Sequence, residues 1–477
     1  MGDRPAGAGV SALAVVASDA VYGHPLPDMA GERNRRWRIH GSPTEREREI
    51  ADRPAYAMLA PARRVNTGMK LSRALGASVF AAILMTGGCD TVWHPSIPPV
   101  AGPAEFPTGQ IARGAELAAI GDCSVCHTTE GSRPYASGRG VQTPFGVVYA
   151  TNITPDPETG IGTWPESAFR RAMREGVDRD GRNLYPVFPY PHFTRATDRD
   201  IAALYAFLMT RPAVHADTPP NRLPFPLNQR FVLTGWDLLY LRPGAWQPDP
   251  AHDADWNRGA YLVEAVGHCG GCHTPRNVLG AETDGQALAG GEAENWYAPP
   301  LQAASPARQG WSVDSLTAYL RTGFDAGHGA AAGPMTAVTA ELATVPAADV
   351  RAMAVYLTSM MPKPAPAPVV AHAGEDPVFA GACGGCHGPD APMMRNGAPS
   401  LAMSTAVNAP TPRGTIQAIL QGLPWREGQA APYMPPFASV LTDAQIAELA
   451  AYLRSAYSDK PAWRDLPAEV ARVRGAS

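Results

Sequence analysis

The chain has 477 residues, which suggests about three domains at the usual ~100–200 residues each. Charged residues make up 18% of it and it contains 47 Gly and 49 Pro, so compact, loop-rich domains are favoured over long helical bundles. The formal net charge of -4 leaves no large basic field, so nucleic acid is not expected as a partner.

The amino terminus divides into two predicted segments. Residues 1–68 contain ten Arg and no Lys and show no sustained apolar period, so we expect a non-native or disordered extension, with translation beginning at Met69. A genuine amino-terminal region is the alternative. Residues 69–89 have a charged start, a short apolar run and small residues before Cys89, which is typical of a secretory signal.

Cys89 follows Gly88 as in a lipoprotein cleavage site, where the cysteine becomes the lipidated first residue of the mature chain. Thr86 stands where such sites usually carry an aliphatic residue. Cleavage elsewhere, or an uncleaved anchor, therefore stays open beside lipidation.

Three C-x-x-C-H motifs carry the strongest signal in the chain. They consist of Cys123, Cys126 and His127; Cys269, Cys272 and His273; and Cys383, Cys386 and His387. In this motif both thiols attach to the vinyl groups of a haem, and the adjacent imidazole becomes the proximal iron ligand. Zinc or thioredoxin-like sites are the alternative, but zinc needs ligands that converge on one metal, and these pairs lie far apart in the sequence. We therefore predict three covalently bound haem c groups.

Similar segments surround each motif. Middle helices are predicted at 165–175, 312–322 and 413–421, each ended by a glycine suited to a left-handed cap, namely Gly176, Gly323 and Gly422. Closing helices are predicted at 198–209, 347–359 and 443–456, the last beginning with a capping box at Thr442 and Gln445. This threefold internal repeat predicts an all-α fold of three tandem cytochrome c domains.

The predicted domains cover residues 105–212, 256–361 and 372–458. Residues 213–255 are rich in Pro and aromatic residues and are expected to form a packed linker. Residues 362–371 are expected to form a short Pro-rich spacer, and 459–477 a tail.

The repeat also places the second axial ligands of the irons. Met335 and Met434 each lie twelve residues after the glycine that ends the middle helix, so we predict them as ligands of the second and third haems. The corresponding residue of the first domain is Phe188, which cannot bind iron. We therefore predict His192 as the ligand of the first haem. The alternative is a five-coordinate or water-bound iron, with His192 as an ordinary loop residue.

Several runs resemble one family. Tyr149-Ala-Thr-Asn-Ile-Thr-Pro-Asp156 and Gly267-His-Cys-Gly-Gly-Cys-His-Thr-Pro-Arg276 are similar to the tri-haem cytochrome subunits of membrane-bound bacterial dehydrogenases. One branch of this family serves quinoprotein alcohol dehydrogenases, and another serves molybdenum hydroxylases that act on aldehydes or N-heterocycles. Phe188 stands where the alcohol branch usually has Met, and residues 223–228 look more like the molybdenum branch.

The resemblance implies an electron-transfer subunit. A catalytic dehydrogenase subunit, either molybdenum-binding with an iron–sulfur partner or a quinoprotein, would pass electrons through the haems to ubiquinone or a terminal oxidase. The expected location is the periplasmic side of the bacterial inner membrane, anchored at the membrane surface through the N-terminal segment or a lipidated Cys89. A multi-haem peroxidase with an open first iron, and a free shuttle cytochrome, are the alternatives.

Overall fold

The computed structural model describes residues 94–100, 105–129, 131–136, 138–303, 310–361, 376–388, 390–395, 400–423 and 433–475. The predicted extension 1–68, the signal-like segment with Cys89, and the spacer 362–371 lie outside these residues. Within them no helix has both the length and the apolar character needed to cross a membrane.

The segment around the first motif consists of α3 (Thr108–Ile120), α4 (Cys123–His127), β1 (Gly140–Thr143), β2 (Gly146–Tyr149), α5 (Glu166–Glu175), α6 (Tyr190–Phe193) and α7 (Asp198–Met209). Helix α5 ends at Gly176, whose φ of 64° is left-handed, as its sequence predicted. Helix α7 begins after Thr197, whose side chain accepts a hydrogen bond from the Asp200 amide.

The segment around the second motif consists of α8 (Val232–Tyr240), α9 (Ala254–Tyr261), the π-helical turn η1 (Leu262–Val266), α10 (Gly270–His273), β3 (Gly291–Ala293), β4 (Trp296–Ala298), α11 (Val313–Thr322), β5 (Phe324–Asp325), β6 (Gly329–Ala330), α12 (Met335–Leu342) and α13 (Ala347–Met360). Helix α11 ends at Gly323 with a φ of 71°. The middle and closing helices thus recur in the order that the repeat predicted.

The segment around the third motif consists of η2 (Phe379–Cys383), α14 (Gly384–His387), α15 (Pro392–Arg395), η3 (Leu401–Met403), α16 (Thr405–Asn408), α17 (Arg413–Gln421), α18 (Asp443–Tyr457) and α19 (Leu466–Gly475). Thr442 and Gln445 form the predicted capping box of α18. Helix α19 lies in the stretch predicted as a tail, and it buries Val470 and Val473 completely.

The fold is mainly helical, but the described residues also contain three two-stranded antiparallel sheets. In β1–β2 Gly140 pairs with Tyr149, and in β3–β4 Gly291 pairs with Ala298. The third hairpin, β5–β6, pairs Phe324 with Ala330. The all-α prediction missed these hairpins because it searched for a helical period, which strands of two to four residues do not interrupt.

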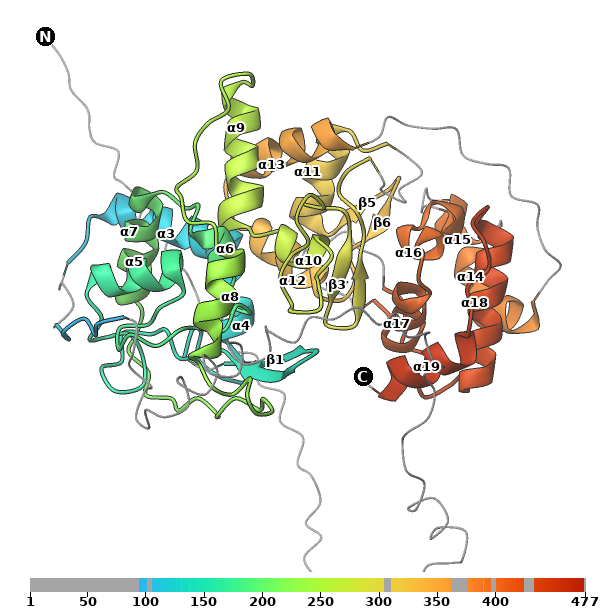
Figure 1. Cartoon of the computed structure of the whole chain (residues 1–477). Coiled ribbons are helices and arrows are strands. Elements are labelled where there is room, and N and C mark those ends of the chain that lie inside the picture. Colours follow the sequence, from blue (N-terminus) through green and yellow to red (C-terminus); the bar gives the residue numbers. More distant parts are fainter. Residues whose placement is uncertain are drawn as a thin grey trace, which may run out of the picture. The chain divides into compact units, whose positions relative to one another are not determined.

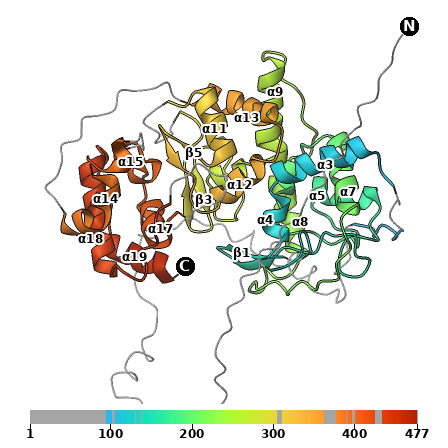
Figure 2. The ribbon, with the colours of Figure 1, turned by 180° about the vertical axis from the view of Figure 1, so that it is seen from behind.

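Glycines allow two equivalent pairs of helices to cross at close range. A Cβ placed on Gly114 of α3 would lie 2.0 Å from the carbonyl oxygen of Ala203 in α7, and one on Gly259 of α9 would lie 1.9 Å from that of Ala352 in α13. Both contacts are far below van der Waals distance, so only glycine permits them. Figures 1 and 2 show α3 beside α7 and α9 beside α13 from opposite sides.

The described residues form two hydrophobic cores. The first is shared by the segments around the first and second motifs and includes Leu117, Ile201, Leu262 and Val350. The second belongs to the segment around the third motif and joins α17, α18 and α19. The first two predicted domains therefore share one core, which the sequence repeat did not indicate.

Candidate haem sites

The first motif occupies one short helix directly after α3. Gly121 ends α3, and Asp122 takes a left-handed φ of 50° before α4 begins at Cys123. The His127 Nδ1 atom lies 2.5 Å from the carbonyl oxygen of Thr151. Since a carbonyl only accepts hydrogen bonds, Nδ1 carries the proton, and the lone pair of the imidazole is left on Nε2.

The second motif repeats this arrangement. His268 takes a left-handed φ of 37° immediately before Cys269, and His273 Nδ1 lies 2.7 Å from the carbonyl oxygen of Pro299. Thr151 and Pro299 both follow the second strand of a hairpin, β2 and β4 respectively. The hairpins that the sequence prediction missed therefore hold the carbonyls that orient the two proximal histidines.

All three motif histidines are partly buried, which favours the neutral imidazole. Burial lowers the pKa of His127, His273 and His387, and a neutral imidazole is the form that binds iron. Within the described residues, the His387 side chain has no hydrogen-bond partner; residues 396–399, which follow α15, lie outside the described residues.

Five of the six motif cysteines are partly buried, and Cys386 is exposed. Burial raises the pKa of Cys123 and Cys269 to about 12, and that of Cys383 to about 11. Redox-active and zinc-binding cysteines need the thiolate, which such an environment disfavours. Among the described residues no three His, Cys, Asp or Glu side chains gather as a metal ion held by protein alone would require. Paired thiols followed by a neutral, oriented imidazole fit a covalently attached haem.

The structure supports the alignment of Met335 with Phe188. Met335 begins α12 shortly after the end of hairpin β5–β6. Val177 and Asn183 form an isolated bridge in the first segment, and Phe188 follows that bridge at the same sequence distance as Met335 follows the hairpin. Both side chains are partly buried against the first core. Met434 pairs with Leu423, directly after Gly422. The ligand roles of the two methionines stay predictions.

His192 lies in a setting that its sequence did not indicate. Its Nδ1 lies 2.8 Å from the carbonyl oxygen of Glu264, and its Nε2 lies 2.6 Å from Oε1 of Glu282. A Cβ on Gly270 of the second motif would lie 2.9 Å from His192 Cε1. Both ring nitrogens are thus used in joining the first segment to the second. The hypothesis that His192 ligates the first haem stays a prediction, with this structural role as its competitor.

A charged network joins the same two segments. Arg258 forms a bidentate pair with Asp349, at 2.9 and 2.8 Å, and Arg113 contacts both Asp349 and Asp200. The Tyr261 hydroxyl donates to Asp200 at 2.7 Å. Burial alone would raise the pKa of Asp349, but the hydrogen bonds and charges of Arg258 and Arg113 outweigh it and lower that pKa.

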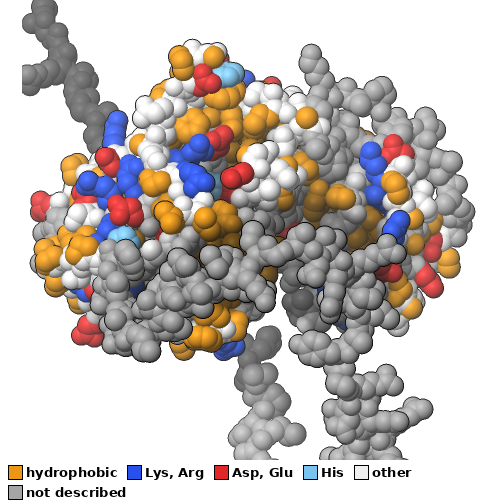
Figure 3. Space-filling model, viewed as in Figure 1, with side chains coloured by type: hydrophobic (Ala, Val, Ile, Leu, Met, Phe, Trp, Pro, Cys, Tyr) orange, Lys and Arg blue, Asp and Glu red, His pale blue; other side chains and the backbone are white. Residues whose placement is uncertain are grey.

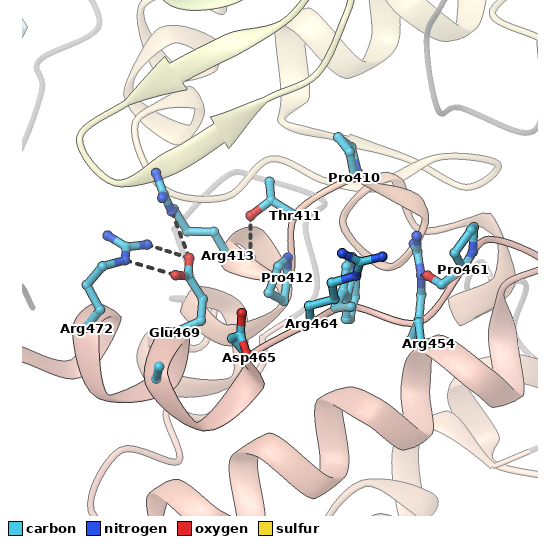
Figure 4. Close-up of a pocket in the computed structure, with 13 residues that line it drawn as sticks. Pro410, Thr411, Pro412, Arg413, Arg454, Pro461, Arg464, Asp465, Glu469 and Arg472 are labelled. Carbon is cyan, nitrogen blue, oxygen red and sulfur yellow. Dashed lines mark hydrogen bonds and ion pairs between the residues drawn. The ribbon is translucent and has the colours of Figure 1, made fainter. Parts of the chain in front are cut away.

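A pocket of about 710 Å³ lies in the third segment, between the start of α17, helix α18 and the loop into α19. Figure 4 shows the Glu469 carboxylate between Arg413 and Arg472, and it accepts hydrogen bonds from both. Arg454 donates to the carbonyls of Val407 and Ala409. The Arg413–Glu469 bond fastens α19 to α17, and Arg454 also donates to the carbonyl of Pro461, in the loop before α19, at 2.8 Å. No motif residue lines the pocket.

Comparison with known proteins identifies the family. The model of the cytochrome c family matches residues 111–212, and that of the cbb3-type cytochrome c oxidase subunit III matches residues 371–453. The fructose dehydrogenase cytochrome subunit of Gluconobacter japonicus is 35% identical over 432 residues, which cover 83% of this chain and 88% of the relative. The chain belongs to the family of dehydrogenase cytochrome c subunits. As a member of it, the chain binds covalent haem c.

This cytochrome subunit covers different shares of the length of two further relatives. The gluconate 2-dehydrogenase cytochrome c subunit of Pantoea cypripedii is 36% identical over 380 residues, 73% of this chain and 86% of the relative. A nicotinate dehydrogenase subunit of Pseudomonas putida is 46% identical over 412 residues, 83% of this chain but only 35% of the relative. The chain thus spans about a third of the latter protein.

Proposed function

We propose that this cytochrome subunit binds three haem c groups and passes electrons from a molybdenum-type dehydrogenase, acting on an aldehyde or N-heterocycle, to ubiquinone or a terminal oxidase. The observation that carries the choice of donor is the 46% identity with a nicotinate dehydrogenase subunit, against 33% with the cytochrome c subunit of the quinone alcohol dehydrogenase of Gluconacetobacter polyoxogenes. Nicotinate is itself an N-heterocycle. Phe188 supports the same branch.

The residues of the motifs suit this role without any catalytic site of their own. Haem supplies the one-electron redox chemistry, while the protein fixes its attachment, orientation and surroundings. Thr151 and Pro299 hold His127 and His273 in the tautomer that presents Nε2. The shared core and the Arg113–Asp349 contact keep the first two motifs in one packed body. Electrons can then pass between fixed sites without reorganisation of the chain.

The proposed location is the periplasmic side of the bacterial inner membrane. Its support is the signal-like stretch of residues 69–89 and the covalent attachment of haem to the motif cysteines. The membrane anchor would be that stretch or a lipidated Cys89.

Reduction by a defined donor tests the proposal. The oxidised holoprotein, mixed with a molybdenum-type nicotinate dehydrogenase preparation that lacks its cytochrome part, should show reduced haem absorption only when nicotinate is added. A quinoprotein alcohol dehydrogenase with ethanol serves as the matched donor. Reduction by the quinoprotein alone would contradict the molybdenum assignment, while reduction by neither donor would contradict both.

The competing peroxidase function rests on Phe188, which replaces the methionine of the other two repeats. In the structure the Phe188 ring packs 5.5 Å from that of Phe193 and 6.3 Å from that of Tyr190. Peroxide-dependent turnover by the isolated subunit would support this function. A low-spin, six-coordinate first haem would exclude it, because peroxide needs an open iron position.

A further inference from the structure

Helix α8 turns an apolar face outward. Phe231, just before the helix, is 54% exposed, and Leu238 and Leu239 within it are 83% and 55% exposed. With Gly235, these positions are spaced as i, i+4, i+7 and i+8, so they form one stripe along the helix. A surface helix normally shows its polar side chains to solvent, and α8 does the opposite.

Neighbouring residues extend this stripe. The Trp236 Nε1 atom donates to the carbonyl oxygen of Leu279 at 3.0 Å, which brings the loop after the second motif against α8. We define the α8 patch by its exposed members, Phe225, Phe231, Leu238, Leu239, Val278 and Leu279. They are six of the ten large hydrophobic residues exposed among the described residues. Figure 3 views the molecule from the same side as Figure 1, where hydrophobic side chains of the described residues are interspersed with charged ones at the surface.

The orientation of α8 is fixed by its inner face. Leu233 is buried, the Tyr190 hydroxyl donates to Asp237 at 2.6 Å, and the Asn183 side chain donates to Thr234 at 2.7 Å. Rotating the helix to hide Leu238 and Leu239 would break these bonds and expose Leu233. The exposure of the patch is therefore specified by the fold, and an exposed patch of this kind marks a binding surface.

The charges around the patch indicate what binds it. Arg222, Arg242 and Arg276 are exposed, in a chain whose net charge is -4. The first two flank residues 223–241 in the sequence, and the third lies shortly before Val278. The only acidic residue between positions 222 and 242 is Asp237, which points inward to Tyr190. Trp236 and Tyr240, each with an apolar ring and a polar end, lie on the same helix.

This combination matches a phospholipid surface. Projecting aliphatic side chains and aromatic residues suit the acyl boundary, and exposed arginines suit anionic headgroups. We propose that the α8 patch inserts into the surface of an anionic membrane, as a contact separate from the predicted N-terminal anchor. The apolar tips enter the acyl boundary, and the arginines meet lipid phosphates. A protein partner would need side chains complementary to protruding residues that are between 51% and 90% exposed, whereas lipid adapts to them.

A position-specific probe tests this contact even if the amino terminus is anchored. In the full holoprotein, Leu238→Cys carries an environment-sensitive dye, and Val440→Cys, 68% exposed and outside the patch, is the matched control. On vesicles rich in phosphatidylglycerol, the dye at position 238 should shift to the blue and be quenched by brominated lipid, while the dye at 440 should not respond. Leu238→Glu with Leu239→Glu should weaken vesicle binding about tenfold or more, and Val440→Glu should not.

Two results would overturn the proposal. One is a dye at 238 that stays in water on vesicle-bound protein, which would leave the N-terminal segment as the membrane contact. The other is a dye at 238 that becomes buried only when the partner dehydrogenase is added, which would make the α8 patch a protein interface.

Discussion

Phe188 distinguishes the first proposed haem site from the other two proposed sites at the scale of a single side chain. Met335 and Met434 are the predicted iron ligands of the second and third sites, and thioether ligation raises the potential of a haem. We expect Met335→Ala and Met434→Ala each to remove one Met–iron charge-transfer band and to lower the potential of one haem. Phe188→Met should add such a band. Absorption spectra of the oxidised protein and a redox titration measure both.

Met353 provides the control for these substitutions, because it is a core methionine of α13 with only 2% exposure. Met353→Leu conserves volume and should leave every charge-transfer band in place. If Met335→Ala behaves like Met353→Leu, the ligand prediction for the second haem is wrong.

The sequence was sufficient for the motifs but not for the groups that support them. Cysteine spacing predicts Cys123, Cys126 and His127 because attachment requires them to be adjacent. The carbonyls of Thr151 and Pro299 are backbone atoms that any residue could supply, so no side-chain pattern identifies them. His192 shows the same limit, since its contact with Glu282 joins residues that are distant in sequence.

At the scale of elements, the close helix crossings at Gly114 and Gly259 should make these glycines important for stability. Gly114→Ala should lower the free energy of unfolding by about 1–3 kcal/mol or more, because the methyl group would clash with the backbone of α7. Gly235→Ala in α8 is the control, since a Cβ there meets no atom within 4 Å. That variant should be neutral or more stable by about 0.5–1 kcal/mol, as alanine favours helix. Urea unfolding of the holoproteins measures both, and equal destabilisation would contradict the crossing.

The ion pair between α9 and α13 should make stability depend on pH. The pKa of Asp349 is lowered in the folded state, so its contribution is present above the ordinary value of 3.8 and is lost as pH falls through the folded pKa. Asp349→Asn should therefore cost about 1–3 kcal/mol at neutral pH, and this difference should vanish in acid.

Asp314→Asn is the matched control for Asp349→Asn, because Asp314 pairs with Arg351 of the same helix α13 but is 87% exposed. It should change stability little at any pH. A cost for Asp349→Asn that persists unchanged in acid would show that its charge is not what stabilises the helices.

Among the elements, the glycine-ended middle helices and the capping box of α18 follow the sequence closely because local chemistry specifies them. Helix α19 was missed for the opposite reason. Its ten residues gain most of their stability by burying Val470 and Val473 against α17 and α18, and isolated helices of this length are marginal in water.

At the scale of the whole molecule, the two hydrophobic cores divide the chain differently from the three repeats. The first two segments share a core and the Arg113–Asp349 contact, whereas the third has its own core. Repeats in a sequence show local similarity, but they do not show which adjacent repeats share a hydrophobic core. We therefore expect the first two segments to unfold together and the third to unfold separately.

Gly259→Ala tests this division, because it places its clash in the second segment only. Under native conditions, amide hydrogen exchange should become faster in α13 and also in α3, since opening of the second segment exposes the core that it shares with the first. Exchange in α18 should stay as in the unmodified protein. Mass spectrometry of peptides from the three helices resolves these outcomes. Faster exchange confined to α9 and α13 would show that the first two segments are independent in spite of their common core.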